Sequence, residues 1–443
     1  MGTLIKNAKI INENKIFEGD ILIENQFISK IASSISVNNH DLIDINGNFL
    51  IPGVIDDQVH FREPGLTHKA NIFSESRAAI AGGITSYMEM PNTIPQTLTQ
   101  NLLAEKIDIG KKTSLANFSF FFGASNENLE EVLKVDFKYT PGVKIFMGSS
   151  TGNMLVDNYS VLNSIFSKCS SLIATHCEDE EIIKQNLKLA QNKYGDNIPI
   201  NEHPKIRSRE ACYKSSSLAI ELAKKHNSRL HILHISTAEE LDLFTNKVPL
   251  KSKRITSEAC IHHLTFKNDD YDKLGSLIKW NPAVKNLSDQ NAIWDALLDD
   301  RIDVIATDHA PHTKHEKNNS YLSCPSGGPL VQHALPMMLQ HMKNGRISIE
   351  KVVEKMCHAP ADCFKISKRG YIREGYFADL VSFKEKKWTV SNENILYHCK
   401  WSPFINKNFD YQISHTIVNG NLCYHNGSFN ESKMGLLIEF NNH

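Results

Sequence analysis

Five residues whose side chains can bind a metal or move a proton each end a short apolar run of this 443-residue chain. They are His60, Lys144, His176, His234 and Asp308. The runs are rich in Val, Ile, Phe and Thr, as expected of buried parallel strands. When such strands close into a barrel, their carboxyl ends meet on the face where barrel enzymes form their active sites. We therefore expect the five side chains to lie together.

Each of these residues has a simpler interpretation when it is taken alone. A lone buried His is more often a hydrogen-bonded core residue than a ligand, and an Asp after a strand is often the N-cap of a helix. The coincidence at the ends of five different strands favours a functional site over five unrelated roles.

The chemistry of this set favours zinc, as one or two ions. Neutral imidazoles and carboxylates are zinc ligands, and an open coordination position leaves room for water. Zinc lowers the pKa of that water to near 7, which supplies hydroxide at neutral pH. Asp308 is the natural base to orient the water and to carry its proton to a leaving nitrogen.

Lys144 is unusual in this set, because an ammonium group beside cations is unfavourable. One interpretation is a lysine that pairs with a carboxylate. The other is that CO2 converts Lys144 into a carbamate, which would bridge two metal ions as a carboxylate.

Four further residues have the chemistry of substrate contacts. Arg62 offers a rigid fork for a carboxylate, and His312 could assist it with an anionic substrate. Asn92 and Asn281 follow apolar runs and could hydrogen-bond an amide or ureide edge. Both also lie next to proline, so turn chemistry explains them equally well.

The sequence around these residues has the pattern of alternating strands and helices. Eight such strands predict a TIM-type (β/α)8 barrel, with a doubly wound open sheet as the alternative. The expected strands are 53–61, 83–92, 114–124, 142–147, 171–177, 229–236, 254–263 and 302–309, and the clearest expected helices are 72–81, 98–111, 180–193, 207–226, 238–244 and 288–298.

Both ends of the chain are rich in β-strand patterns and lie outside the barrel. Strands are expected at 4–11, 16–23, 27–35 and 41–50, and again at 371–372, 380–383, 413–418 and 421–424, with Asn419-Gly420 as a hairpin turn. We expect one composite β domain made of residues 1–51 and 367–443, around a barrel of residues 52–366.

Composition narrows the class of protein. The net charge of −1 gives no sign of a basic surface that would bind nucleic acid or an anionic membrane. No apolar run approaches the length of a membrane span. Nine scattered cysteines without a Cys-x-x-Cys pair indicate reduced thiols. We expect a cytoplasmic protein.

The motifs around these residues, in order along nearly the whole chain, resemble those of the dihydroorotase family. They are His60-Phe61-Arg62-Glu63-Pro64-Gly65, Met90-Pro91-Asn92-Thr93, Ala174-Thr175-His176-Cys177-Glu178, His231-Ile232-Leu233-His234-Ile235-Ser236-Thr237, Glu258-Ala259-Cys260-Ile261-His262-His263-Leu264, Asn281-Pro282, Thr307-Asp308-His309-Ala310-Pro311-His312, Gly370-Tyr371-Ile372-Arg373-Glu374-Gly375 and Trp401-Ser402-Pro403-Phe404.

The resemblance implies a zinc-dependent barrel enzyme that reversibly cyclises N-carbamoyl-L-aspartate to L-dihydroorotate in pyrimidine biosynthesis. Position by position, it assigns His60, His176, His234 and Asp308 to the metal site and Asp308 also to catalysis. It assigns Arg62, Asn92, Asn281 and His312 to the substrate, and Lys144 resembles a bridging lysine of some relatives. The expected partners are a second copy of the chain and aspartate transcarbamoylase.

One departure from the family pattern leaves rival functions open. The first motif of the family usually reads His-x-His, whereas this chain has Gln58-Val59-His60. A glutamine carbonyl is a poorer zinc ligand than imidazole, so the more buried metal is expected to be weakly held or absent. The alternatives are a non-catalytic subunit that scaffolds aspartate transcarbamoylase and a related cyclic-amide hydrolase, such as a hydantoinase or allantoinase.

Overall fold

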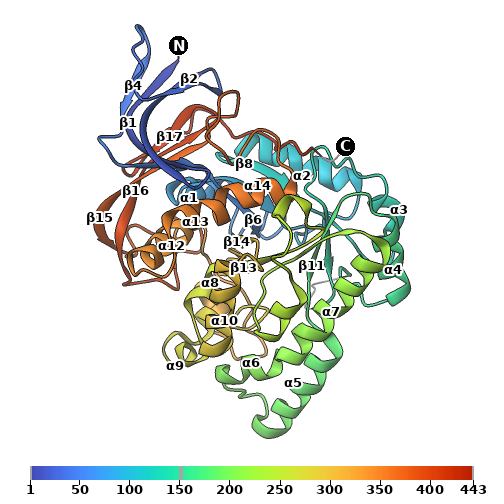
Figure 1. Cartoon of the computed structure of the whole chain (residues 1–443). Helices are drawn as coiled ribbons and strands as arrows, with labels where there is room; N and C mark the ends of the chain where they lie inside the picture. Colours follow the sequence, from blue (N-terminus) through green and yellow to red (C-terminus); the bar gives the residue numbers. More distant parts are fainter. Residues whose placement is uncertain (1, 149–152, 442–443) are drawn as a thin grey trace.

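A computed structural model describes residues 2–148 and 153–441. In Figure 1 a barrel with its helices adjoins a β-rich part built from the blue start and the red end of the chain. The helices are α1 (Ile72–Ala81), α2 (Gln100–Thr113), α3 (Leu129–Val132), α4 (Tyr159–Lys168), α5 (Glu180–Tyr194), α6 (His203–Ile206), α7 (Arg209–His226), α8 (Ile261–Thr265), α9 (Tyr271–Leu274), α10 (Leu287–Leu298), α11 (Lys314–Lys317), α12 (Ala334–Lys343), α13 (Ile349–Val353) and α14 (Ala359–Phe364). None of these is long and apolar enough to cross a membrane.

The eight expected barrel strands are all present, and every neighbouring pair is parallel. They are β6 (Val54–Val59), β7 (Ile84–Glu89), β8 with β9 (Asn117–Phe120 and Phe122–Gly123), β10 (Val143–Phe146), β11 (Leu172–His176), β12 (Arg229–Ile232), β13 (Ile255–Cys260) and β14 (Val304–Ala306).

The hydrogen-bonded ladder of the barrel is interrupted at two places. One sheet runs β6-β7-β8 and the other runs β9 to β14. Phe121 alone separates β8 from β9, and a parallel bridge between Val59 and His309 joins β6 to the residues after β14. The strands therefore follow one another around a barrel, as expected, rather than forming an open sheet.

The composite sheet joins the two ends of the chain. Its order is β18-β17-β16-β15-β5-β1-β2-β3, with β4 beside β1. The strands are β1 (Thr3–Asn12), β2 (Lys15–Glu24), β3 (Phe27–Ala32), β4 (Asp41–Asp44), β5 (Phe49–Pro52), β15 (Leu380–Thr389), β16 (Asn408–Val418), β17 (Asn421–His425) and β18 (Ser428–Phe429). The seam is the antiparallel pairing of β5 with β15, where Leu380 faces Pro52. Apolar residues from both ends, including Ile10, Ile21 and Ile417, form one core cluster.

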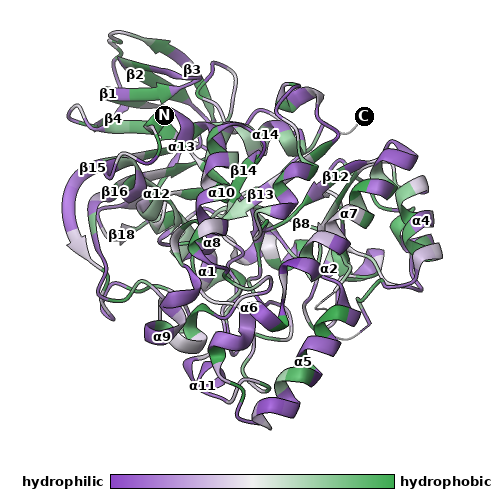
Figure 2. Ribbon diagram, turned by 60° about the horizontal axis from the view of Figure 1, so that its bottom comes forward, coloured by the Kyte–Doolittle hydropathy of each residue, from purple (hydrophilic) through white to green (hydrophobic). Residues whose placement is uncertain are grey.

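Local sequence signals explain most element boundaries. The Asn71 side chain and Ser74 cap α1 reciprocally, and Asn419 and Gly420 take the positive φ values of a tight hairpin turn. The outer helix α5 mixes hydrophilic and hydrophobic residues along its length in Figure 2, and its buried residues, Ile183 and Ala190, are apolar.

Three expected elements differ from the structure. The helix expected at 238–244 is a 3-10 turn, Glu239–Leu243, and the strand expected at 41–50 is split into β4 and β5. Residues 371–372 are not a strand, because the Asn12 side chain takes the hydrogen bonds of the Ile372 backbone that a neighbouring strand would make.

Candidate active site

All nine residues singled out in the sequence line a single cavity of about 250 Å3 at the carboxyl ends of the barrel strands. They are His60, Arg62, Asn92, Lys144, His176, His234, Asn281, Asp308 and His312. The rest of the lining is Gln58, Phe146, Trp280, Ala310 and the segment 325–327. A larger cavity of about 410 Å3 at the opposite end of the barrel contains none of the nine.

His60 and Asp308 form the first pair of candidate metal ligands. His60 Nε2 is 3.2 Å from Asp308 Oδ1. On its other side, His60 Nδ1 donates to Asn92 Oδ1 at 2.7 Å. That bond fixes the tautomer, so the lone pair of Nε2 points towards Asp308 and the site. Asn92 therefore orients a candidate ligand as well as lining the cavity.

His176 and His234 form the second pair. His176 Nε2 donates to Glu178 Oε2 at 3.0 Å, which leaves the Nδ1 lone pair directed at His234 Nε2, 2.9 Å away. Although burial acts in the other direction, Arg207 and His176 hold the pKa of Glu178 well below its ordinary value. Glu178 therefore stays an anion that orients His176.

The donor set fits a metal centre. Four residues with imidazole or carboxylate ligands face one cavity, and the facing nitrogens of the second pair, His176 Nδ1 and His234 Nε2, are 2.9 Å apart. Neighbouring ligands on tetrahedral zinc are roughly 3.3 Å apart, close to the separations within both pairs. The four do not form one group within 4.8 Å among the described residues, so they divide into two pairs rather than one compact cluster.

Lys144 lies among these ligands with its ammonium group buried. Its Nζ has no hydrogen-bond partner in the described part of the chain. Burial lowers the pKa of Lys144 to about 7, against the pull of Glu258 and Asp308. Burial lowers the pKa of His60, His176 and His234, and the charge of Lys144 adds to each decrease. A substantial fraction of Lys144 is thus a neutral amine near pH 7.

Asp308 also has a perturbed pKa. Burial raises it to about 7, and His176, Lys144 and Arg62 oppose that rise. A carboxyl group whose pKa is near 7 both accepts and returns a proton at neutral pH, which is the property that a general base needs.

The opposite wall of the cavity is cationic. Arg62 Nη2 is 3.0 Å from His312 Nε2, and Lys69 Nζ is 3.2 Å from His312 Nδ1. Burial, with Arg62 and Lys69 adding to it, holds the pKa of His312 well below its ordinary value, so His312 is neutral between two cations. An anionic group of a ligand is stabilised here.

Two amide side chains of the cavity, those of Asn281 and Gln58, differ in which polar atom they leave free to contact a ligand. Asn281 Oδ1 is buried without a hydrogen-bond partner among the described residues, so it can accept a bond from a ligand. Gln58 Nε2 donates to Asp308 Oδ1 at 3.3 Å, and Gln58 Oε1 faces the thiol of Cys260 at 3.7 Å. Gln58 thus presents a donor, not its carbonyl oxygen, to the candidate ligand Asp308.

Three site residues have left-handed backbones. The φ angles are 69° at Arg62, 41° at His234 and 47° at Asp308. Such a conformation costs a non-glycine residue about 1–3 kcal/mol and is concentrated at functional sites. The strand ends turn sharply at these points and aim the side chains into the cavity.

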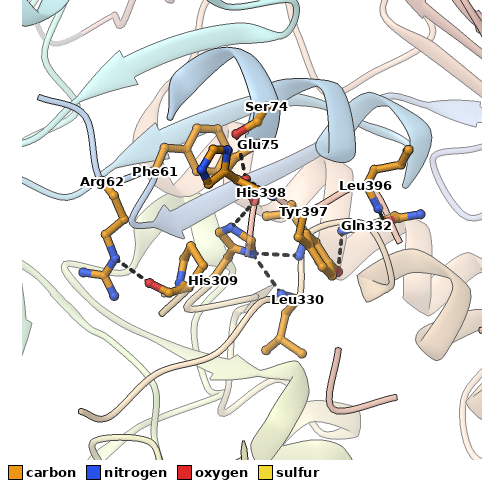
Figure 3. A network of polar contacts seen from close by, with 12 residues as sticks. Phe61, Arg62, Ser74, Glu75, His309, Leu330, Gln332, Leu396, Tyr397 and His398 are labelled. Atoms are coloured by element: carbon orange, nitrogen blue, oxygen red, sulfur yellow. Dashed lines mark hydrogen bonds and ion pairs between the residues drawn. The ribbon is translucent and has the colours of Figure 1, made fainter. Parts of the chain in front are cut away.

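A polar network behind the cavity holds the segment that carries Asp308 (Figure 3). His309 Nε2 is 2.9 Å from Glu75 Oε2, and His309 Nδ1 accepts from the Leu330 backbone at 2.9 Å. Glu75 in turn accepts from the backbone of His398 at 2.9 Å. The His309 carbonyl accepts from the His60 backbone at 2.7 Å, so one network ties both ligand-bearing segments together.

The sequence did not reveal several residues that hold the side chains of the cavity in place. Glu178, Lys69 and Glu75 hold His176, His312 and His309, respectively. The only signal was Glu178 two positions after His176, because the other two lie in helical or loop patterns without a distinctive motif.

The sequence comparisons identify relatives along nearly the whole chain. Residues 49–423 match the amidohydrolase family. A dihydroorotase from Methanosphaera stadtmanae is 33% identical, over 95% of this chain and 95% of that protein. A dihydroorotase from Carboxydothermus hydrogenoformans is 32% identical, over 96% and 98%. The resemblance to dihydroorotases is confirmed.

Solved structures agree on the architecture. L-hydantoinase (dihydropyrimidinase) from Arthrobacter aurescens superposes with a TM-score of 0.92 at 26% identity, covering 99% of both chains. Dihydropyrimidinase from Brevibacillus agri gives 0.87 at 21% identity, covering 98% of this chain and 97% of that one, which bears on the fold alone. The expected barrel with its composite β part is confirmed.

Proposed function

This chain belongs to the amidohydrolase family, and we propose that within it the protein is a dihydroorotase, which reversibly cyclises N-carbamoyl-L-aspartate to L-dihydroorotate. The carrying observation is a single cavity whose lining contains both the candidate metal ligands and Arg62 with His312, the latter contacted by Lys69 from outside the lining. The sequence relatives that carry the dihydroorotase name support this substrate over those of the hydantoinases.

We propose zinc, as one or two ions, at His60, His176, His234 and Asp308, with Lys144 as a bridging carbamate. When bound, zinc would polarise the reacting carbonyl and lower the pKa of a water molecule. Both nearby contacts of Asp308, to His60 and to Gln58, involve Oδ1. The attacking water therefore gives its proton to Oδ2, and Asp308 passes it to the leaving ring nitrogen.

The substrate is oriented by the other wall of the cavity. The Arg62 guanidinium binds the carboxylate that dihydroorotate carries on its ring, and neutral His312 extends that contact. Asn281 Oδ1 accepts a hydrogen bond from a ring N–H. In the biosynthetic direction the carbamoyl nitrogen attacks the side-chain carboxyl group, Asp308 takes up the nitrogen's proton, and water leaves.

Replacement of Arg62 tests the substrate assignment. A hydrogen bond to a charged group contributes about 1.5–3 kcal/mol, so Arg62→Ala is expected to lower kcat/KM for dihydroorotate on the order of 10–100-fold. Dihydrouracil, which lacks the carboxylate, is the matched control and its turnover should change little. Unchanged kinetics with dihydroorotate would rule out this role of Arg62.

The second candidate is a non-catalytic subunit that scaffolds aspartate transcarbamoylase. Gln58, which replaces a family histidine and donates to Asp308, is the observation that favours it. Bound zinc and turnover of dihydroorotate, measured on the same preparation, separate the two. Metal-free, inactive protein of normal fold supports the scaffold, whereas zinc with turnover supports the enzyme.

We further infer a homodimer, an association with aspartate transcarbamoylase and a cytoplasmic location. The nine cysteines are all free, which supports a reducing compartment. Sedimentation of the purified chain, alone and with aspartate transcarbamoylase, tests the first two inferences.

A further inference from the structure

A second cluster of metal-binding side chains lies inside the barrel. Asp57 on β6, His231 on β12 and Glu258 on β13 are each 0% exposed. One ligand atom from each residue lies within 4.8 Å of the other two. His231 Nε2 is 3.2 Å from Asp57 Oδ2 and 3.5 Å from Glu258 Oε2.

This cluster is separate from the active-site cavity. None of its three residues lines that cavity. The thiol of Cys260 lies between the two, 3.7 Å from Gln58 Oε1 and 3.3 Å from Glu258 Oε1. On the other side the ring of Phe364, from α14, packs against His231 with ring centroids 5.2 Å apart.

The hydrogen bonds around His231 fix which nitrogen faces the carboxylates. The Thr256 hydroxyl donates to the Leu230 carbonyl at 3.3 Å, so at 2.8 Å it accepts from His231 Nδ1. A neutral His231 then directs the lone pair of Nε2 at Asp57 and Glu258. Lone pairs that face one another in a dry interior require a positive charge between them, which either a metal ion or a proton on His231 supplies.

The remaining polar atoms of the cluster point to the same conclusion. Apart from the contacts within the cluster, both oxygens of Asp57, Glu258 Oε2 and His231 Nε2 are buried without a hydrogen-bond partner in the described part of the chain. The other oxygen of Glu258 accepts from the His234 backbone at 2.8 Å, which orients Oε2 towards His231. The cluster therefore has oriented, unused ligand atoms.

We propose that Asp57, His231 and Glu258 bind a structural divalent metal ion of the zinc type, distinct from the active-site metal. Neighbouring ligand atoms on tetrahedral zinc, with bonds of about 2.0–2.2 Å, lie roughly 3.3–3.5 Å apart, and the two contacts of His231 match that spacing. Two carboxylates neutralise a divalent ion, and Thr256 is the outer partner that such a ligand histidine needs. The ion stabilises the barrel by relieving the repulsion of the buried carboxylates.

Anomalous scattering tests the site directly. Crystals of the full-length chain, purified and equilibrated with zinc, are expected to give an anomalous peak at the zinc edge between Asp57, His231 and Glu258. The alternative is a proton on His231 that holds the two carboxylates without metal. The absence of a peak there overturns the proposal, whether or not the active-site cavity holds zinc.

Metal content of variants gives an independent readout. Asp57→Asn and Glu258→Gln are each expected to bind one equivalent of zinc per chain less than the wild type. A chelator should also lower the Tm of each variant by less than it lowers the Tm of the wild type, because this ion is already missing. Glu240→Gln is the control, because Glu240 is equally buried but bonded to Ser216 and Thr237. Wild-type zinc content in both variants would contradict the proposal. If neither variant folds, the presence or absence of the anomalous peak in the wild-type chain decides whether the site binds zinc. Turnover of dihydroorotate is not used to test this site.

Discussion

Gln58 presents its amide nitrogen to Asp308, and this single contact bears on the number of metal ions. A donor at this position satisfies the carboxylate that a second ion would otherwise share. A histidine here would instead offer a lone pair, as His60 does.

Gln58→His is therefore expected to raise the zinc bound per chain, or to tighten its binding, without loss of fold. Metal analysis after dialysis against a weak chelator measures the change, and Gln58→Asn, which keeps an amide, is the matched control. Equal zinc retention by the wild type and Gln58→His would show that this position does not limit metal binding.

Lys144 gives a prediction about pH. Only the neutral amine attacks CO2, and its pKa of about 7 means that the neutral fraction grows as pH rises through 7 and falls below it. We expect carbon-13 bicarbonate to give a carbamate signal that strengthens from pH 6 to pH 8 and is absent in Lys144→Arg. A signal that persists in Lys144→Arg would place the carbamate elsewhere.

At the scale of elements, the segment after β14 forms part of the cavity wall because buried lysines hold it. Lys317 Nζ, at the end of α11, donates to the carbonyls of Pro325 at 2.9 Å and Gly327 at 2.8 Å. Lys279 Nζ donates to the carbonyl of Cys324 at 2.5 Å. Neither buried lysine needs a carboxylate as its partner, because several backbone carbonyls accept hydrogen bonds from each ammonium group.

Lys317→Met is expected to lower stability by about 1–3 kcal/mol, because it leaves buried carbonyls without a donor. It should also raise KM, since residues 325–327 line the cavity. Urea unfolding and steady-state kinetics measure the two effects. Lys314→Met, on the exposed side of the same short helix, should change neither, and equal behaviour of the two variants would refute the role of Lys317.

At the scale of the whole molecule, the last residues return from the composite sheet to the barrel. The backbone nitrogen of Gly435 bonds to Ser114, and that of Ile438 to Phe118 on β8. Ile438 and Phe440 are buried in a cluster with Phe364 of α14. The last described residues thus close the amino-terminal side of the barrel beside β8.

Removal of residues 434–443 is therefore expected to lower Tm by several degrees, since it removes two large buried apolar side chains and exposes their barrel partners. Removal of 442–443 alone is the control. Differential scanning calorimetry measures both, and an unchanged Tm in the longer deletion would mean that the tail contributes no net stability. The domain boundaries at 51/52 and 366/367 stay a prediction, which limited proteolysis can test.

The sequence by itself determined the class of the barrel and the residues that line the cavity at the carboxyl ends of its strands. Hydrophobic periodicity fixed the eight strands, and the carboxyl ends of parallel strands must meet, so His60, His176, His234 and Asp308 could be placed together from the chain alone. Nearly every expected strand and helix was found, with errors where a side chain such as Asn12 replaced a strand partner.

Only the tertiary structure decided which atoms of those residues face one another. Hydrogen bonds that His60 donates to Asn92 and His176 donates to Glu178 set the tautomers of the two histidines, and the amide of Gln58 turned towards Asp308. The buried cluster of Asp57, His231 and Glu258 also emerged only there. Its members are 174 and 27 residues apart along the chain, and no local motif links them until the barrel brings their strands together.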